Sequence, residues 1–133
     1  HYEKVLQSQA VYQLTAYFNN APVAVVVFVR FGNTFTYLYG ASDYPHRDLM
    51  APYLLQWQGI QMGKSSDCQW YDFFGVAPVK DGGYDQNHQY AGVTRFKLGF
   101  GGVPHETPGT FDFVINGGKY KLYNILRKLR RLF

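Results

Sequence analysis

The sequence predicts a single mixed α/β domain, and three observations predict it. The chain has 133 residues, a length that fits one domain with a usable core. Hydrophobic residues make up 47% of the chain, which favours a packed globule over a disordered segment. Strand-like and helix-like runs follow in the order strand, strand, strand, helix, strand, helix, strand, helix.

Residues 10–42 are predicted to form a three-stranded antiparallel meander. Asn19-Asn20 and Gly32-Asn33 are turn signals between runs rich in β-branched and aromatic residues. The middle run, "VAVVVFV" at residues 23–29, is almost entirely apolar, so we expect burial on both faces at the sheet centre. Strand alternation places Phe35, Tyr37 and Tyr39 on one face of the third strand.

The remaining elements follow from spacing and turn residues. Apolar residues recur at helical spacing over residues 49–64, and residues 69–76 form a short strand. Residues 80–90 are polar and contain paired glycines, which indicates a loop. We expect a short helix over residues 92–100 that Gly99 or Gly101 ends. A strand over 109–116 and a helix over 120–133 complete the prediction.

Composition excludes several classes of site. Cys68 is the only cysteine, which rules out an intrachain disulfide framework and a thiolate metal cluster. The four histidines lack the spacing of paired metal ligands, so no metal site is predicted. The longest apolar run is too short to span a bilayer, and no apolar segment follows a basic start as in a signal peptide. Phosphate-binding glycine loops and a nucleophile elbow are absent from the sequence.

The net charge of +4 is concentrated near the C-terminus, in "KYKLYNILRKLRRLF". A basic terminal helix can meet RNA phosphates or anionic lipid. The same pattern also occurs on the solvated face of an ordinary docking helix.

Lys97 is the most informative ionisable residue. A lysine with an ordinary pKa of about 10.4 acts at neutral pH as a cation and not as a base. Gly101 and Gly102 follow closely, and bare backbone there lets a ligand approach. Lys97 therefore suits a phosphate or an oxyanion. The alternative is a solvated helix lysine beside a tight turn.

Four stretches in one order and spacing carry a family resemblance. They are "YLYGAS" (37–42), "WYDFFGV" (70–76), "RFKLGFGG" (95–102) and "KYKLYNILRKLRR" (119–131). Together they resemble the C-terminal half of the Fem family, the non-ribosomal peptidyltransferases that build peptidoglycan interpeptide bridges. The resemblance implies an α+β fold like that of the Gcn5-related N-acetyltransferases, with a mixed, mostly antiparallel sheet flanked by helices. Residues 1–133 would then be one such domain, the C-terminal half of a longer two-domain protein.

The resemblance also implies a reaction. An aminoacyltransferase of this family moves an amino acid from aminoacyl-tRNA, its co-substrate, to a side-chain amine of the stem peptide of a peptidoglycan precursor. No cofactor is implied. The implied partners are aminoacyl-tRNA, a lipid-linked or nucleotide-linked precursor, and an N-terminal sister domain. The implied location is the cytoplasm, at the inner face of the bacterial membrane with peripheral contact. We expect the isolated chain to be inactive.

The resemblance assigns Lys97 to the family's functional lysine, near the 3′ end of the tRNA and the reacting carbonyl. Asp72 and the neighbouring Tyr71 are candidates for orienting the acceptor or relaying the proton that the amine loses. Candidate substrate-binding residues, each with a purely structural alternative, are Tyr39, Ser42, Tyr71, Phe96, Phe100, Gly101 and Gly102. Strand alternation separates Tyr71 from Asp72, so we expect only one of the two to act.

Two other functions remain open. One is a coenzyme A-dependent N-acyltransferase of the same fold. Residues 41–50, "ASDYPHRDLM", lack the Gln/Arg-x-x-Gly-x-Gly/Ala turn that holds the coenzyme A pyrophosphate in acetyltransferases, which disfavours this alternative. The other is a non-catalytic domain that binds tRNA or a partner protein.

Overall fold

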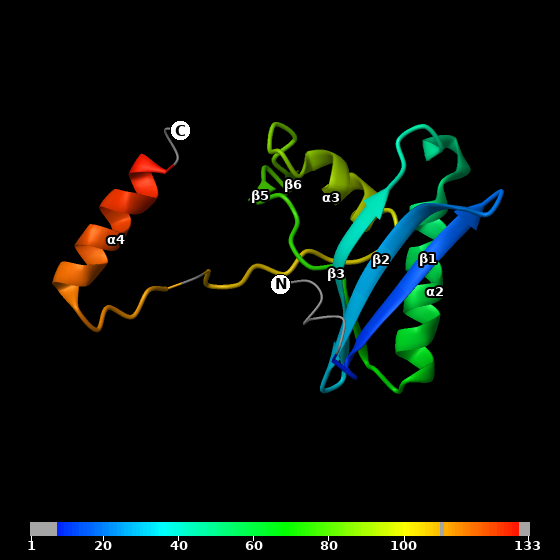
Figure 1. Cartoon of the computed structure of the whole chain (residues 1–133), viewed down its shortest axis with the longest axis horizontal. Helices are drawn as coiled ribbons and strands as arrows, with labels where there is room; N and C mark the ends of the chain where they lie inside the picture. The colour runs from blue at the N-terminus through cyan, green and yellow to red at the C-terminus, as the bar shows by residue number, and fades with distance from the viewer. Residues whose placement is uncertain (1–7, 110, 131–133) are drawn as a thin grey trace. The chain divides into compact units, whose positions relative to one another are not determined.

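The computed structural model describes residues 8–109 and 111–130, and the chain divides into two compact units, His1–Gly102 and Val103–Phe133 (Figure 1). The first unit contains a four-stranded sheet in the order β1-β2-β3-β4. Strands β1 (Val11–Phe18), β2 (Ala21–Phe31) and β3 (Thr34–Ser42) form the predicted antiparallel meander. Asn19, Asn20 and Gly32 have positive φ angles at the two hairpins, which is why these residue types occur there.

Strand β4 (Trp70–Asp72) pairs with β3 in parallel and gives the sheet its mixed character. It begins inside the predicted strand at 69–76 but ends four residues early. The Asp72 carboxylate accepts a hydrogen bond from the backbone N–H of Phe74 at 2.7 Å, and Phe74 has a φ of 61°. This side-chain turn directs the chain away from the sheet.

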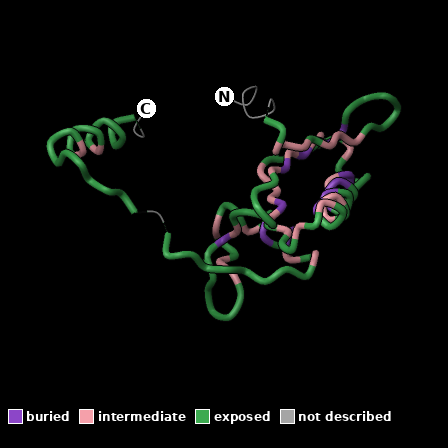
Figure 2. The backbone as a smooth tube through the Cα atoms, turned by 90° about the horizontal axis from the view of Figure 1, so that it is seen from below, coloured by how far each residue is buried: buried purple, intermediate pink, exposed green. Residues whose placement is uncertain are grey.

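Helix α2 (Ala51–Ser65) covers one face of the sheet, after the short 3₁₀ helix η1 (Arg47–Leu49). Its buried residues and those of β2 and β3 form the core, in which Phe28 and Phe35 are fully buried (Figure 2). Gly59 of α2 lies directly against the Phe28 ring, where any side chain would collide. The predicted helix at 49–64 is thus confirmed with its start shifted to Ala51.

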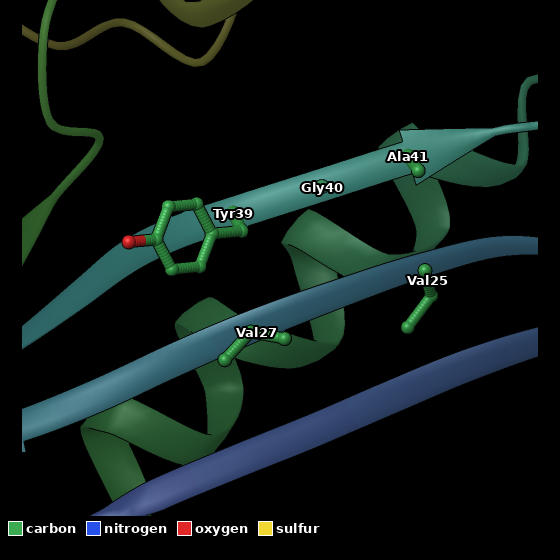
Figure 3. Close-up of a pocket in the computed structure, with 5 residues that line it drawn as sticks. All are labelled: Val25, Val27, Tyr39, Gly40 and Ala41. Carbon is green, nitrogen blue, oxygen red and sulfur yellow. The ribbon is translucent and has the colours of Figure 1, made fainter. Parts of the chain in front are cut away.

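The prediction that β2 is buried on both faces is wrong. Along β2 the burial alternates: Val26 and Phe28 are buried under α2, whereas Val25 and Val27 are half-exposed. Figure 3 shows Val25 and Val27 lining a hollow on the face away from α2. A run of apolar residues therefore does not establish burial on both faces, because that also needs a second covering layer.

The predicted common face of Phe35, Tyr37 and Tyr39 is also wrong for Tyr39. Val27 pairs with Tyr39 and Phe28 with Tyr37, so the register slips by one residue and Leu38 forms a bulge. Tyr37 thus stays on the side of Phe28, with ring centroids 6.2 Å apart, while Tyr39 faces the other way.

The rest of the first unit contains a small hairpin and a helix. Strands β5 (Val79–Lys80) and β6 (Gly83–Tyr84) occupy part of the predicted polar loop. Helix α3 (Ala91–Leu98) confirms the predicted short helix at 92–100, and Gly99 ends it.

The second unit contains helix α4 (Gly117–Leu129). It begins three residues before the predicted helix at 120–133, because the Asn116 side chain accepts a hydrogen bond from the Lys119 N–H at 3.0 Å. The strand predicted at 109–116 is wrong for the residues described: they form no strand, and Phe113 is 93% exposed. A strand needs a partner for its backbone groups, and no described segment pairs here. Thr110 and residues 131–133 of these predictions lie outside the described residues.

Candidate functional site

Lys97 projects from α3 into the protein and is only 7% exposed. Its Nζ donates a hydrogen bond to the carbonyl oxygen of Gly75 at 2.6 Å and lies 5.6 Å from the centre of the Tyr37 ring. Burial lowers the pKa of Lys97, and the Asp72 carboxylate partly offsets this. Lys97 is therefore not the solvated helix lysine of the structural alternative.

Thr94 precedes Lys97 by one helical turn and is fully buried. Its hydroxyl donates to the Tyr90 carbonyl at 2.7 Å and accepts from the Ala77 N–H at 2.8 Å. Thr94 and Lys97 thus bind the backbone of the same segment, residues 75–77, from one face of α3. This pair of contacts fixes the chain that follows β4.

Asp72 and Tyr71 face opposite ways, as strand alternation predicts. Asp72 is exposed, and its carboxylate raises the pKa of Lys97, the other residue proposed as catalytic. Tyr71 is half-buried beneath α2, and its hydroxyl donates to Oε1 of Gln56 at 2.6 Å. Burial, with a smaller contribution from Tyr37, raises the pKa of Tyr71, so its phenol stays protonated.

Phe96 and Phe100 belong to a half-exposed aromatic cluster beside Lys97. Phe96 lies 4.7 Å from Tyr53 in an edge-on arrangement, and Phe100 stacks on Tyr53 at 5.6 Å. Phe73 lies 5.2 Å from Phe100. These rings hold the end of α3 against α2 and against Phe73, the residue after β4, and part of their surface remains accessible.

Gly101 and Gly102 form the exposed turn after α3. Gly101 has a φ of 81°, and no atom lies within 4 Å of the place that a side chain would take at either glycine. The backbone there is open to a ligand, as the sequence predicts.

Tyr39 and Ser42 lie apart from this group. Tyr39 lines a hollow of about 250 Å³ with Val25 and Val27 on the sheet face away from α2 (Figure 3). Ser42 lines an adjoining hollow of about 250 Å³ at the end of β3. Lys97 lines neither of these two hollows.

Sequence reasoning missed Gln56, Tyr37 and Thr94. The available signal for Gln56 was a glutamine within the apolar run of a helix. The signal for Thr94 was its position one helical turn before Lys97, which places both residues on one face of α3. No sequence pattern indicates that the Gly75 carbonyl meets Lys97.

Within residues 8–109 and 111–130, no three His, Cys, Asp or Glu side chains gather as a metal site would require. Likewise, none of the helices in those ranges is long and apolar enough to cross a bilayer.

The fold matches a solved acetyltransferase. The apo structure of the aminoglycoside 6'-N-acetyltransferase AAC(6')-IG from Acinetobacter haemolyticus matches with a TM-score of 0.64 over 86% of this chain and 78% of that chain, at 14% identity. This confirms the predicted fold of Gcn5-related N-acetyltransferase type, a mixed, mostly antiparallel sheet with helices.

Sequence comparisons identify relatives of the chain. Aminoacyltransferase FemB of Staphylococcus epidermidis is 33% identical over 104 residues, which are 77% of this chain and 24% of that protein. Lipid II:glycine glycyltransferase of S. epidermidis is 30% identical over 99 residues, 74% of this chain and 22% of that protein. The chain thus spans about a quarter of the length of these relatives. The sequence model of the FemAB family matches residues 3–128. The chain belongs to the FemAB family, as its sequence predicts.

Proposed function

We propose that this chain is part of an enzyme that transfers an amino acid from aminoacyl-tRNA to the stem-peptide amine of a peptidoglycan precursor. The observation that carries the proposal is the family match over residues 3–128. The name of one relative, lipid II:glycine glycyltransferase, supports a lipid-linked acceptor and a glycyl donor.

In the proposed reaction, the amine nitrogen attacks the carbonyl carbon of the aminoacyl ester. A carbon–nitrogen bond forms, the bond to the ribose oxygen of the tRNA breaks, and the amine loses a proton that the leaving oxygen finally takes up. Because the ester is already activated, bringing the amine and the ester together supplies much of the rate.

Lys97 is proposed to stabilise the tetrahedral oxyanion or a phosphate of the tRNA. An ammonium has three N–H donors, and the Gly75 carbonyl takes one of them. The remaining donors can meet an anion, and a fixed donor of this kind contributes about 3 kcal/mol to transition-state stabilisation. Asp72, which is exposed and whose carboxylate raises the pKa of Lys97, is proposed to receive the proton of the amine.

Other candidates are proposed to bind the substrates. Phe96 and Phe100 offer accessible ring surface beside Lys97, which suits stacking of the terminal adenine. Gly101 and Gly102 allow the 3′ end of the tRNA to approach the backbone. Because Tyr71 is engaged under α2, we propose that it supports Asp72 from the core. Tyr39 and Ser42 would contact a different part of the substrates, in their own hollows.

We further propose that the chain belongs to the C-terminal acetyltransferase-like half of a longer two-domain protein, as the family resemblance implies; its matched residues cover 24% of its FemB relative, which leaves room for a further domain. A sister domain would supply the rest of the acceptor site, and the isolated chain would then show little turnover. The enzyme would act in the cytoplasm at the inner face of the membrane, where a lipid-linked acceptor is available.

A coenzyme A-dependent acyltransferase is the second candidate, and the match to an aminoglycoside acetyltransferase favours it. The full-length protein is the right material for a test. It would be given radiolabelled glycyl-, alanyl- or seryl-tRNA with a lipid-linked or nucleotide-linked precursor, and separately titrated with acetyl-coenzyme A by calorimetry. Labelled precursor without coenzyme A binding is the expected result. Acetyl-coenzyme A binding without label transfer would favour the second candidate. A protein that shows neither label transfer nor acetyl-coenzyme A binding would be a non-catalytic binding domain.

A further inference from the structure

Gln56 is a polar residue in the middle of an aromatic core. It lies on α2, its side chain is fully buried, and its Oε1 accepts the Tyr71 hydroxyl at 2.6 Å. Its Nε2 is buried and has no hydrogen-bond partner among the described residues. A buried amide whose two N–H donors are both unpaired destabilises a fold relative to an apolar side chain of the same size. Stability alone therefore does not account for a glutamine here.

The Tyr71 hydroxyl that Gln56 holds belongs to a strand of three residues. Strand β4 pairs with β3 at Trp70, Tyr71 and Asp72 only, and a side-chain turn follows directly. The Tyr71 ring packs on Phe73, with ring centroids 4.9 Å apart, and on the core rings of Phe28 and Phe35 at 6.1 and 6.2 Å. Those ring contacts are non-directional, whereas the hydrogen bond fixes the position of the ring along its own axis.

Asp72 is the next residue along β4 and acts on Lys97. Any shift or rotation of β4 that releases the Tyr71 hydroxyl also moves Asp72 and the chain leading to Gly75, the hydrogen-bond acceptor of Lys97. Asp72 of β4 raises the pKa of the Lys97 ammonium, and the ring of Tyr37 of β3 lies 5.6 Å from it. Of these, Asp72 is the one whose position depends on β4.

We propose that Gln56 is a positioning residue: by holding the Tyr71 hydroxyl, it fixes β4 and so keeps Asp72 and the Gly75 carbonyl in place around Lys97. The catalytic role of this arrangement rests on the proposed aminoacyl transfer. Gln56 itself touches no substrate, because its side chain is fully buried.

The test compares Gln56→Met, Tyr71→Phe and the double variant in the full-length protein. Gln58→Met is the matched control, since Gln58 is an exposed glutamine of the same helix. We expect kcat/KM to fall about tenfold in each single variant, through kcat more than KM. The kcat/KM of the double variant should equal that of a single variant, because both substitutions break the same hydrogen bond. Gln58→Met should match the wild type.

The pH profile separates positioning from stability. If Asp72 moves away from Lys97, the pKa of Lys97 falls, so the basic limb of the profile should shift to lower pH in Gln56→Met. An unchanged profile with only a lower Tm, or losses that add in the double variant, would overturn the proposal. Titration of the Lys97 Nζ by NMR, in protein labelled with ¹⁵N-lysine, gives the same answer without turnover. If the wild type transfers no amino acid but the pKa of Lys97 measured by NMR is still lower in Gln56→Met than in the wild type, the proposed function is refuted and the positioning role stands.

Discussion

The ammonium of Lys97 and the carbonyl of Gly75 are joined by a 2.6 Å hydrogen bond that ties α3 to the chain after β4. Lys97 is thus fixed from the helix side and from the loop side, with Asp72 nearby. An ammonium held in this way needs little reorganisation to meet an anion, which is the condition for electrostatic stabilisation of a transition state. The same bond also gives Lys97 a structural role, and the two roles can be separated by experiment.

Thr94→Val should destabilise the protein by about 1–3 kcal/mol, because the Ala77 N–H, which donates to the Thr94 hydroxyl, is left without an acceptor. Urea unfolding measures this change. Thr107→Val, at an exposed threonine of the second unit, is the control and should change stability far less. Equal effects at the two positions would show that the Thr94 contact contributes nothing.

Gly59→Ala should destabilise the protein by about 1–3 kcal/mol, since its new methyl group meets the fully buried Phe28 ring. Gly92→Ala in α3 meets no atom within 4 Å and should be neutral or stabilising. Thermal unfolding of the two variants provides the comparison. A Gly59→Ala protein as stable as Gly92→Ala would contradict the packing of α2 on β2.

Tyr71→Phe should lower the free energy of unfolding at neutral pH, and should lower it by less at high pH. The folded-state pKa of Tyr71 is raised, so the stability that its phenol contributes is fully present below the unfolded pKa of about 10 and is lost as the pH rises above it. The measurement is urea unfolding of wild type and variant at about pH 8 and about pH 11. The difference between the two proteins should shrink at the higher pH, and a constant difference would exclude a buried, neutral phenol.

Neutralising Lys128, Arg130 and Arg131 tests whether the basic C-terminus contacts tRNA. If all three meet phosphates, the slope of log K against log salt for tRNA binding by the full-length protein should fall by about 2–3 units. Exchanging Lys64, an exposed lysine at the end of α2, for glutamine is the control. An unchanged slope would leave α4 as a docking helix only.

The sequence predicted the elements with local signals and missed features that depend on distant contacts. Turn residues and β-branched runs predicted the meander, and apolar spacing predicted α2. The bulge at Leu38, which turns Tyr39 away from Tyr37, depends on how β2 and β3 pair and has no local signal. The strand expected at 109–116 had the right alternation but has no described pairing partner.

The candidate site shows the same division. The family resemblance indicated Lys97, and the need to remove a proton from the amine indicated Asp72, whose carboxylate raises the pKa of Lys97. The contact between Lys97 and a backbone carbonyl could not be predicted, because every residue has such a carbonyl. The buried bond between Gln56 and Tyr71 joins two elements whose packing the sequence does not specify.

The most direct test of the account compares Lys97→Met with Thr94→Val in the full-length protein. Both substitutions remove a bond to residues 75–77, but only the first removes the cation. We predict that Lys97→Met lowers kcat/KM for aminoacyl transfer by about 100-fold to 1,000-fold, far more than Thr94→Val at a similar loss of Tm. Equal losses of activity, in step with stability, would contradict the account and leave Lys97 a structural residue.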